Sequence, residues 1–134
     1  MIKVGIDTNV LLRLLVDDDP VQRDAVLSFG KGLGESHSGY ITLISLVEMD
    51  WALRKQYGYS KRQSVSALQK ITQVRGVEIQ APDAVVRTIS GGENGDGDFA
   101  DILISHLCLD AGCNHVVTLD KKAAAKIPAM ELLA

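Results

Sequence analysis

The chain has 134 residues, the usual length of one domain and too short for two ordinary ones. Hydrophobic residues make up 46% of the sequence, so a core can form without a disulfide or a structural metal. The formal net charge of −3 excludes a protein that binds nucleic acid through a large overall positive charge, but it leaves room for local basic patches. The longest apolar stretch near the start, 10–16, is far too short to span a bilayer, and no signal peptide is recognisable. We therefore expect a cytoplasmic protein without membrane segments.

The cysteines and histidines of the chain are not spaced as they would be in a metal site or a redox motif. Cys108 and Cys113 form no CxxC motif and have no second pair for a zinc site, so we expect two reduced thiols. His37, His106 and His115 have no partner at metal-ligand spacing, and we expect them to be structural or exposed.

Short apolar runs alternate with segments of helical periodicity along the first half of the chain. Aspartates and Pro20 mark one helix start, Ser60 caps another, and Gly58 and Gly76 mark helix ends. In chain order, the pattern predicts a strand over 2–6, helices over 10–16 and 20–29, a strand over 40–43, and helices over 46–57 and 61–74.

The second half continues the alternation. The pattern predicts a strand over 77–79, helices over 82–90 and 99–111, a strand over 115–119, and an edge strand near 130–133. Glycines crowd the stretch 90–97, which predicts a mobile loop. Strands separated by helices favour a mainly parallel sheet of four to five strands with helices on both faces, hence an α/β fold over 1–134.

Acidic residues follow the predicted strands. Asp7 ends the first strand, Glu48 begins the helix after the second, Asp98 and Asp101 flank a helix start, and Asp120 follows the fourth strand. The ligand site of an open parallel sheet lies at the carboxyl ends of its strands. We therefore expect these carboxylates at one edge of the sheet.

Each carboxylate also has a purely structural interpretation. Ser45-x-x-Glu48 has the spacing of a capping box, Asp98-x-x-Asp101 resembles one, and Asp7 and Asp120 can cap the helices that follow them. Taken together, however, clustered carboxylates repel one another unless they are protonated or hold a cation. Oxygen-only ligands select a hard ion, so the set predicts a site for Mg²⁺, with Mn²⁺ as a substitute.

Four ordered motifs carry a family resemblance. In chain order they are Asp7-Thr8-Asn9-Val10-Leu11-Leu12-Arg13, Ser45-Leu46-Val47-Glu48 with Trp51 one turn on, Asp98-Phe99-Ala100-Asp101, and Val117-Thr118-Leu119-Asp120-Lys121. Together these motifs resemble the PIN-domain toxins of VapBC toxin–antitoxin systems. The resemblance implies a PIN-like α/β/α sandwich and a magnesium-dependent endoribonuclease. It also implies a cognate antitoxin as partner and a homodimer.

The resemblance assigns roles to individual residues. Asp7, Glu48, Asp101 and Asp120 match the family's catalytic acids, and Asp98 matches an extra acid that could join the metal ligands. The polar residues expected to orient carboxylates or water are Thr8, Asn9 and Thr118. Basic residues expected to hold the RNA backbone include Arg13, Arg54 and Lys121.

Other functions share parts of this pattern. A PIN nuclease in RNA processing would carry the same acids. A magnesium-binding phosphoacceptor domain would be expected to have two adjacent acids after its first strand, whereas Asp7 is followed by Thr8. A non-catalytic interaction module would function unchanged without the carboxylates.

Overall fold

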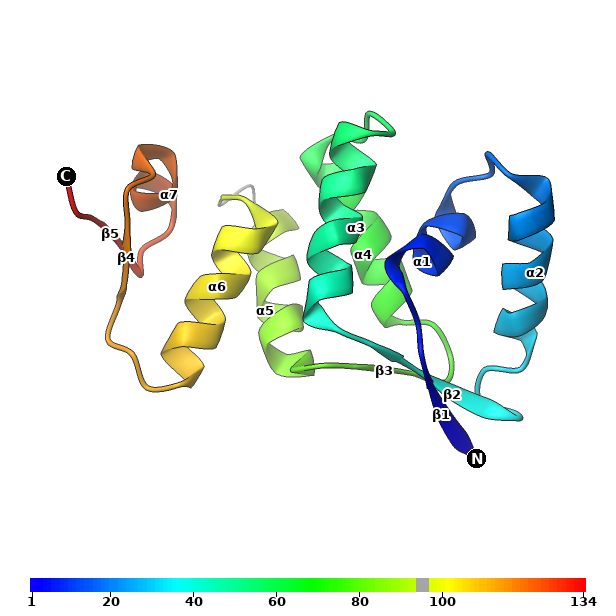
Figure 1. Ribbon diagram of the computed structural model, residues 1–134. Helices are drawn as coiled ribbons and strands as arrows, with labels where there is room; N and C mark the ends of the chain where they lie inside the picture. Colours follow the sequence, from blue (N-terminus) through cyan, green and yellow to red (C-terminus); the bar gives the residue numbers. More distant parts are fainter. Residues whose placement is uncertain (94–96) are drawn as a thin grey trace. The chain divides into compact units, whose positions relative to one another are not determined.

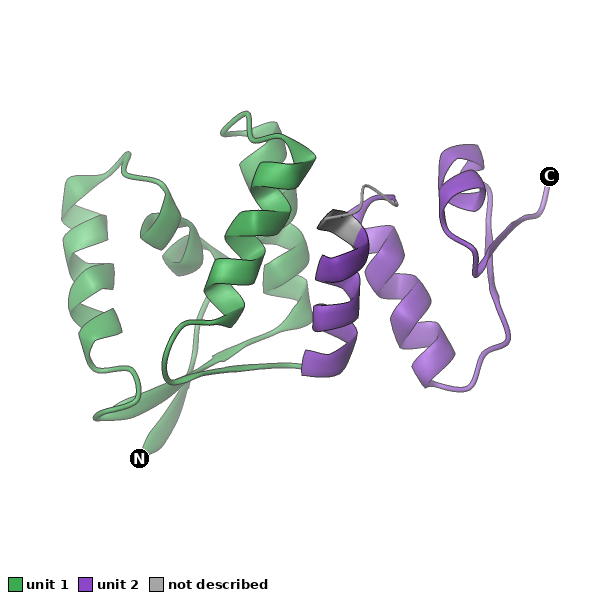
Figure 2. Cartoon of the chain, turned by 180° about the vertical axis from the view of Figure 1, so that it is seen from behind, with its two compact units in different colours: residues 1–81 green, residues 82–134 purple. Residues whose placement is uncertain are grey.

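A computed structural model describes residues 1–93 and 97–134. The chain divides into two compact units, Met1–Ala81 and Pro82–Ala134, which we describe separately as unit 1 and unit 2 (Figure 2). Within the described residues, no helix combines the length and the apolar character needed to cross a membrane.

Unit 1 contains a parallel three-stranded sheet in the order β1-β2-β3, formed by β1 (Ile2–Gly5), β2 (His37–Ile41) and β3 (Val77–Ile79). The turn before β3 depends on Gly76. Its φ of 77° is unfavourable for other residues, and a β-carbon there would collide with the backbone of Gly34. The glycine that the sequence assigns to the end of a helix thus also allows the close approach of two chain segments.

Four helices connect these strands: α1 (Thr8–Leu15), α2 (Pro20–Lys31), α3 (Leu43–Lys55) and α4 (Lys61–Thr72) (Figure 1). Each begins after a side chain that accepts a backbone hydrogen bond, and these capping residues are Asp7, Asp19, Thr42 and Ser60. Asp7 lies two residues after the end of β1 and Thr42 directly follows β2, so α1 and α3 both start at the carboxyl ends of strands.

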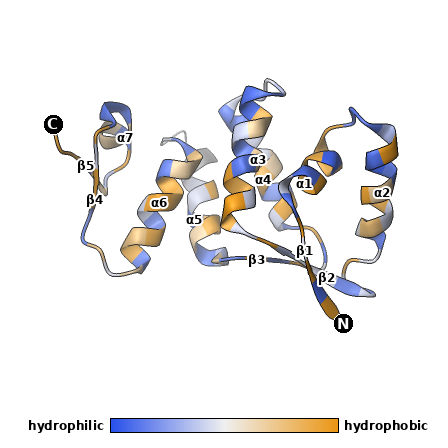
Figure 3. Ribbon diagram, in the orientation of Figure 1, coloured by the Kyte–Doolittle hydropathy of each residue, from blue (hydrophilic) through white to orange (hydrophobic). Residues whose placement is uncertain are grey.

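The core of unit 1 is built around α3, which packs against both α1 and α4. Its hydrophobic residues lie mainly in the N-terminal half of the helix (Figure 3). The side chains with an exposed fraction of 1% or less in this core are Leu11, Ile41, Leu46, Met49, Leu53, Val65 and Leu68. Burial on this scale fixes the orientation of α3 within unit 1, and with it the direction of the residues on its polar side.

Unit 2 consists of α5 (Pro82–Glu93), α6 (Phe99–Asp110), β4 (Val116–Thr118), α7 (Lys121–Lys126) and β5 (Met130–Leu132). Helix α5 packs against α6, and α7 connects the parallel strands β4 and β5. A small hydrophobic cluster joins α6 to the C-terminal segment through Ile102, Ala123, Ile127 and Met130.

The α/β class and the parallel pairing expected from the sequence are confirmed. Within the described residues, three of the strands pair in unit 1 and two in unit 2. The loop predicted over 90–97 is wrong over 90–93, because α5 continues to Glu93. Residues 94–96 of this predicted loop lie outside the described residues. Strand β2 starts at His37 instead of residue 40, and α3 starts at Leu43 instead of residue 46.

Candidate active site

Asp7 stands at the junction between β1 and α1. Its backbone is extended, and its carboxylate Oδ1 accepts a 2.7 Å hydrogen bond from the backbone N–H of Thr8. The capping role allowed by the sequence is therefore present. The capping role is compatible with a catalytic one, because the Asp7 side chain is exposed at the carboxyl end of a parallel strand, where such folds bind ligands.

Glu48 does not belong to a capping box. Helix α3 begins at Leu43, and the side chain of Thr42 accepts a 3.2 Å hydrogen bond from the backbone N–H of Ser45. Ser45 is therefore buried inside the first turn, and the capping interpretation of Ser45 and Glu48 is wrong. Glu48 Oε1 instead accepts a 2.8 Å hydrogen bond from the Thr8 hydroxyl, which connects α3 to the start of α1.

These side chains share an open cleft of about 570 Å³ in unit 1. The start of α1 contributes one wall and α3 the other. The cleft is lined by Asp7, Thr8, Asn9, Leu12, Val47, Glu48, Trp51, Ala52 and Gln56. Two carboxylates, a hydroxyl and two side-chain amides thus meet in a space open to solvent, beside a single aromatic ring.

Unit 2 supplies the other predicted acids. Asp98 occupies the N-cap position of α6, and Asp101 lies in its first turn. Asp120 caps α7: its Oδ1 accepts hydrogen bonds from the backbone N–H groups of Lys122 and Ala123 at 2.9 and 3.1 Å. Thr118 Oγ1 accepts a 3.0 Å hydrogen bond from the backbone N–H of Asp120, so it fixes the turn that presents this carboxylate.

The surroundings of Asp101 in unit 2 disfavour the charged form of its carboxyl. Burial raises the pKa of its carboxyl above the ordinary value, and the negative charges of Asp98 and Asp120 raise it further. A cation near these three carboxylates would relieve this repulsion, and carboxylate oxygens are the ligands that Mg²⁺ and Mn²⁺ prefer. The donor set therefore fits a divalent ion. Within either unit, however, the described His, Cys, Asp and Glu side chains form no group of three or more close enough to hold an ion unaided.

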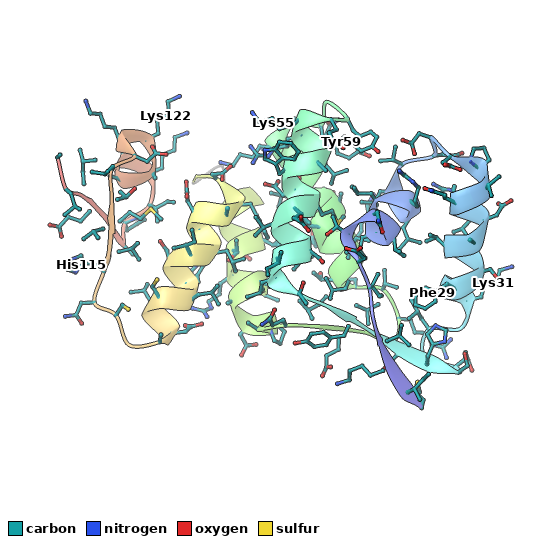
Figure 4. All side chains as sticks on the ribbon, in the orientation of Figure 1. Phe29, Lys31, Lys55, Tyr59, His115 and Lys122 are labelled. Atoms are coloured by element: carbon teal, nitrogen blue, oxygen red, sulfur yellow. The ribbon has the colours of Figure 1, made fainter. Side chains whose placement is uncertain are left out.

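The basic residues expected to hold RNA differ in their surroundings. Arg13 donates to Asp18 at 2.8 Å and to Gln22 at 2.9 Å. Arg54 donates to both carboxylate oxygens of Asp50, at 3.2 and 2.9 Å. Both arginines thus stabilise unit 1. Lys121, in contrast, is exposed at the start of α7, next to Lys122, which Figure 4 labels.

Sequence reasoning missed two residues here. Asp50 is a buried carboxylate that also accepts a 2.6 Å hydrogen bond from the Ser64 hydroxyl of α4. Its i,i+4 spacing from Arg54 was a usable signal. Gln56 lines the cleft beyond Trp51, and nothing in the local sequence distinguishes it from an ordinary surface glutamine.

Comparison with known families matches residues 4–128 to the PIN domain family. The chain belongs to this family, whose members are nucleases that typically use divalent metal ions. Among curated proteins, no match was found. Among solved structures, the chain is similar to one in the crystal structure of VapBC2 from Rickettsia felis bound to a DNA fragment from their promoter. The two share 16% identity over 98% of each chain, with a TM-score of 0.38.

Proposed function

We propose that the chain is a metal-dependent endoribonuclease and acts in the cytoplasm as the toxin of a type II toxin–antitoxin pair. The observation that carries the nuclease proposal is the cleft in which Asp7 and Glu48 lie at the end of β1 and on α3, with Glu48 held by Thr8. The choice of RNA and the toxin role rest on the ordered motifs that resemble VapC toxins.

We further propose that both units belong to one PIN domain, since the family match runs from residue 4 to residue 128 and so spans both. The four carboxylates Asp7, Glu48, Asp101 and Asp120 would then serve one reaction. Asp7, Asp98, Asp101 and Asp120 are the candidate ligands for Mg²⁺, which Mn²⁺ could replace. When bound, such an ion lowers the pKa of water and offsets charge on the phosphate.

The chain's own residues prepare this chemistry by position and charge. The Thr8 hydroxyl donates to Oε1 of Glu48 and so helps to position this carboxylate, to which we assign the acceptance of a proton from an attacking water. Burial and the negative charges of Asp98 and Asp120 raise the pKa of Asp101, and a bound cation would offset both effects. Lys121 is placed beside Asp120 in the chain, where its ammonium group can hold a phosphate of the substrate. The partners we propose are an RNA substrate, a cognate antitoxin and a second copy of the chain.

The direct test is to incubate the purified chain with total bacterial RNA and to map the new RNA ends. Cleavage at defined positions in Mg²⁺ or Mn²⁺, abolished by a chelator and restored by adding the ion, is the expected result. Undiminished cleavage by metal-stripped protein would contradict the assignment of the acids as ligands. Cleavage of DNA but not of RNA would contradict the ribonuclease proposal.

A further inference from the structure

Trp51 is an exposed aromatic side chain in a cleft whose lining also includes acids, amides, a hydroxyl and the apolar residues Leu12, Val47 and Ala52. It is the only tryptophan of the chain, and 53% of its surface is exposed. Its neighbours Met49, Ala52 and Leu53 on the same helix are buried. An aromatic ring of this size usually contributes to a core or to an interface. Core packing in unit 1 therefore does not account for Trp51.

The position of Trp51 on α3 relates it to the carboxylate of Glu48. Residues three and seven positions apart share one face of a helix, so Glu48, Trp51 and Lys55 follow one another along α3. A rise of about 1.5 Å per residue separates Trp51 from Glu48 by roughly 4.5 Å and from Lys55 by roughly 6 Å along the axis. Lys55 is exposed near the C-terminal end of α3, where Figure 4 also labels Tyr59. This face thus presents a carboxylate, an indole ring and an ammonium group in order.

We propose that Trp51 is a stacking platform for one base of a single-stranded RNA bound in the cleft, with Lys55 holding a neighbouring phosphate. This inference rests on the proposed ribonuclease function and specifies the form of its substrate. A flat π-face binds any unpaired base, whereas the bases of a duplex are already stacked on one another. Stacking beside Glu48 would place the strand next to the acids.

The other lining residues favour a nucleic acid over a protein partner on this surface. Asn9 and Gln56 can donate to and accept from base edges. A protein-binding patch would instead be expected to have a continuous exposed apolar centre. Here the apolar lining residues Leu12 and Ala52 are buried, and the same cleft contains the carboxylates of Asp7 and Glu48. The combination of one aromatic ring with amides and a nearby lysine is the pattern of a single-stranded nucleic-acid site.

The single tryptophan makes the test direct, since all indole fluorescence comes from position 51. The probe is an unlabelled RNA of about 12 nucleotides without self-complementarity, within the site sizes of single-stranded binders. It is mixed with the full chain in Mg²⁺ and read at once, before cleavage proceeds, and a gel of each sample shows that the RNA was still intact at the reading. We expect saturable quenching by this RNA and little by the same sequence in a duplex. Binding detected by anisotropy of a labelled copy without quenching, or no binding at all, would overturn the proposal.

Two substitutions distinguish the effect of the aromatic face of Trp51 from the effect of its apolar volume. Trp51→Phe keeps an aromatic face, whereas Trp51→Leu keeps an apolar side chain without one. Loss of one base–aromatic stack weakens binding by about 5- to 150-fold, so we expect a loss of this size for Trp51→Leu and a much smaller one for Trp51→Phe. Equal affinity of the Leu variant and the wild type would contradict the proposal. A changed oligomer size with unchanged RNA affinity would contradict it too, and would identify a protein interface instead.

Failure of this inference is distinguishable from failure of the proposed function. If the wild type cleaves RNA and Trp51→Leu binds and cleaves equally well, the stacking platform is wrong and the nuclease stands. If RNA quenches Trp51 but neither Mg²⁺ nor Mn²⁺ supports cleavage, the nuclease proposal fails while the RNA-binding role of Trp51 is supported.

Discussion

The hydroxyl of Thr8 donates a 2.8 Å hydrogen bond to Oε1 of Glu48, across 40 positions of sequence. The same residue provides the backbone N–H that donates to Asp7. Thr8 therefore touches both carboxylates of the cleft, one through its backbone and one through its side chain. Because it begins α1 while Glu48 lies on α3, this contact also fixes the two walls of the cleft relative to each other.

Replacing the hydroxyl of Thr8 tests this positioning role. Thr8→Val has nearly the same shape but cannot donate to Glu48. We expect its RNA cleavage to fall by about 10- to 100-fold, the size of loss seen when a residue that positions a functional side chain is removed. Thr8→Ser keeps the hydroxyl and should keep most of the activity. Cleavage rates at saturating RNA, measured beside melting temperatures, decide the matter. Equal rates for the Val and Ser variants would show that the hydrogen bond does not matter for the reaction.

Asp7→Asn separates capping from chemistry. Asparagine caps a helix nearly as well as aspartate, so the free energy of unfolding should change by at most about 1 kcal/mol. The loss of a charge expected to hold the ion should instead lower cleavage by more than about 100-fold, beyond the loss usual for residues that only support a ligand. Urea unfolding and cleavage assays on the same preparation provide both numbers. A fully active Asp7→Asn variant would show that Asp7 caps α1 and has no role in the reaction.

Asp101 should make stability depend on pH and on metal. Its ordinary pKa is 3.8, and burial together with Asp98 and Asp120 raises that value in the folded chain. The folded state therefore holds this proton more tightly than the unfolded state does. The stability associated with the protonated carboxyl is present below the ordinary pKa and is lost as the pH rises through the raised one.

Asp101→Asn removes the partly buried negative charge that destabilises the folded chain at neutral pH. In a chelator at neutral pH, the variant should therefore melt at a higher temperature than the wild type, and the difference should vanish below about pH 3.8. Adding Mg²⁺ should raise the melting temperature of the wild type more than that of the variant. Calorimetry across pH, with and without the ion, measures both effects. A variant that melts below the wild type in chelator would refute the inference that the charged form of Asp101 destabilises the folded chain.

Arg54 is expected to act through Asp50 rather than through RNA. Asp50 is 2% exposed and depends on Arg54 and Ser64 for its hydrogen bonds. Arg54→Met leaves this buried carboxylate without its charge partner and should cost about 3 kcal/mol of unfolding free energy. Lys55→Met, on the exposed neighbour, should change stability by less than about 0.5 kcal/mol. If Arg54→Met is as stable as the wild type but weakens RNA binding, the original expectation of a phosphate contact is the better one.

The sequence predicted those features that depend on local chemistry. The start of α4 was predicted from Ser60, and a reciprocal capping box with Gln63 is present. The start of α3 was placed wrongly, because Thr42 and Ser45 are both good capping residues and local preference does not choose between them. The choice follows from packing, since Ser45 is 7% exposed and therefore lies within the first buried turn.

The same distinction applies to the candidate site. The placement of Asp7 and Asp120 after strands could be predicted, because capping and strand periodicity are local signals. The contact between Thr8 and Glu48 could not be, since it depends on how two helices pack and on side-chain rotamers. The exposure of Trp51 also follows from tertiary packing, because the sequence shows only that it lies on the same helical face as Glu48.

We propose that carboxylates from both units serve one reaction. The most direct measurement compares Asp7→Asn, Asp101→Asn and the double variant. Residues that act as a unit are strongly non-additive in their effects on rate. Single-turnover RNA cleavage in saturating Mg²⁺ should therefore fall by more than about 100-fold in each single variant. The double variant should be hardly slower than the slower single one. Two independent losses that multiply in the double variant, or one single variant that cleaves like the wild type, would contradict the account.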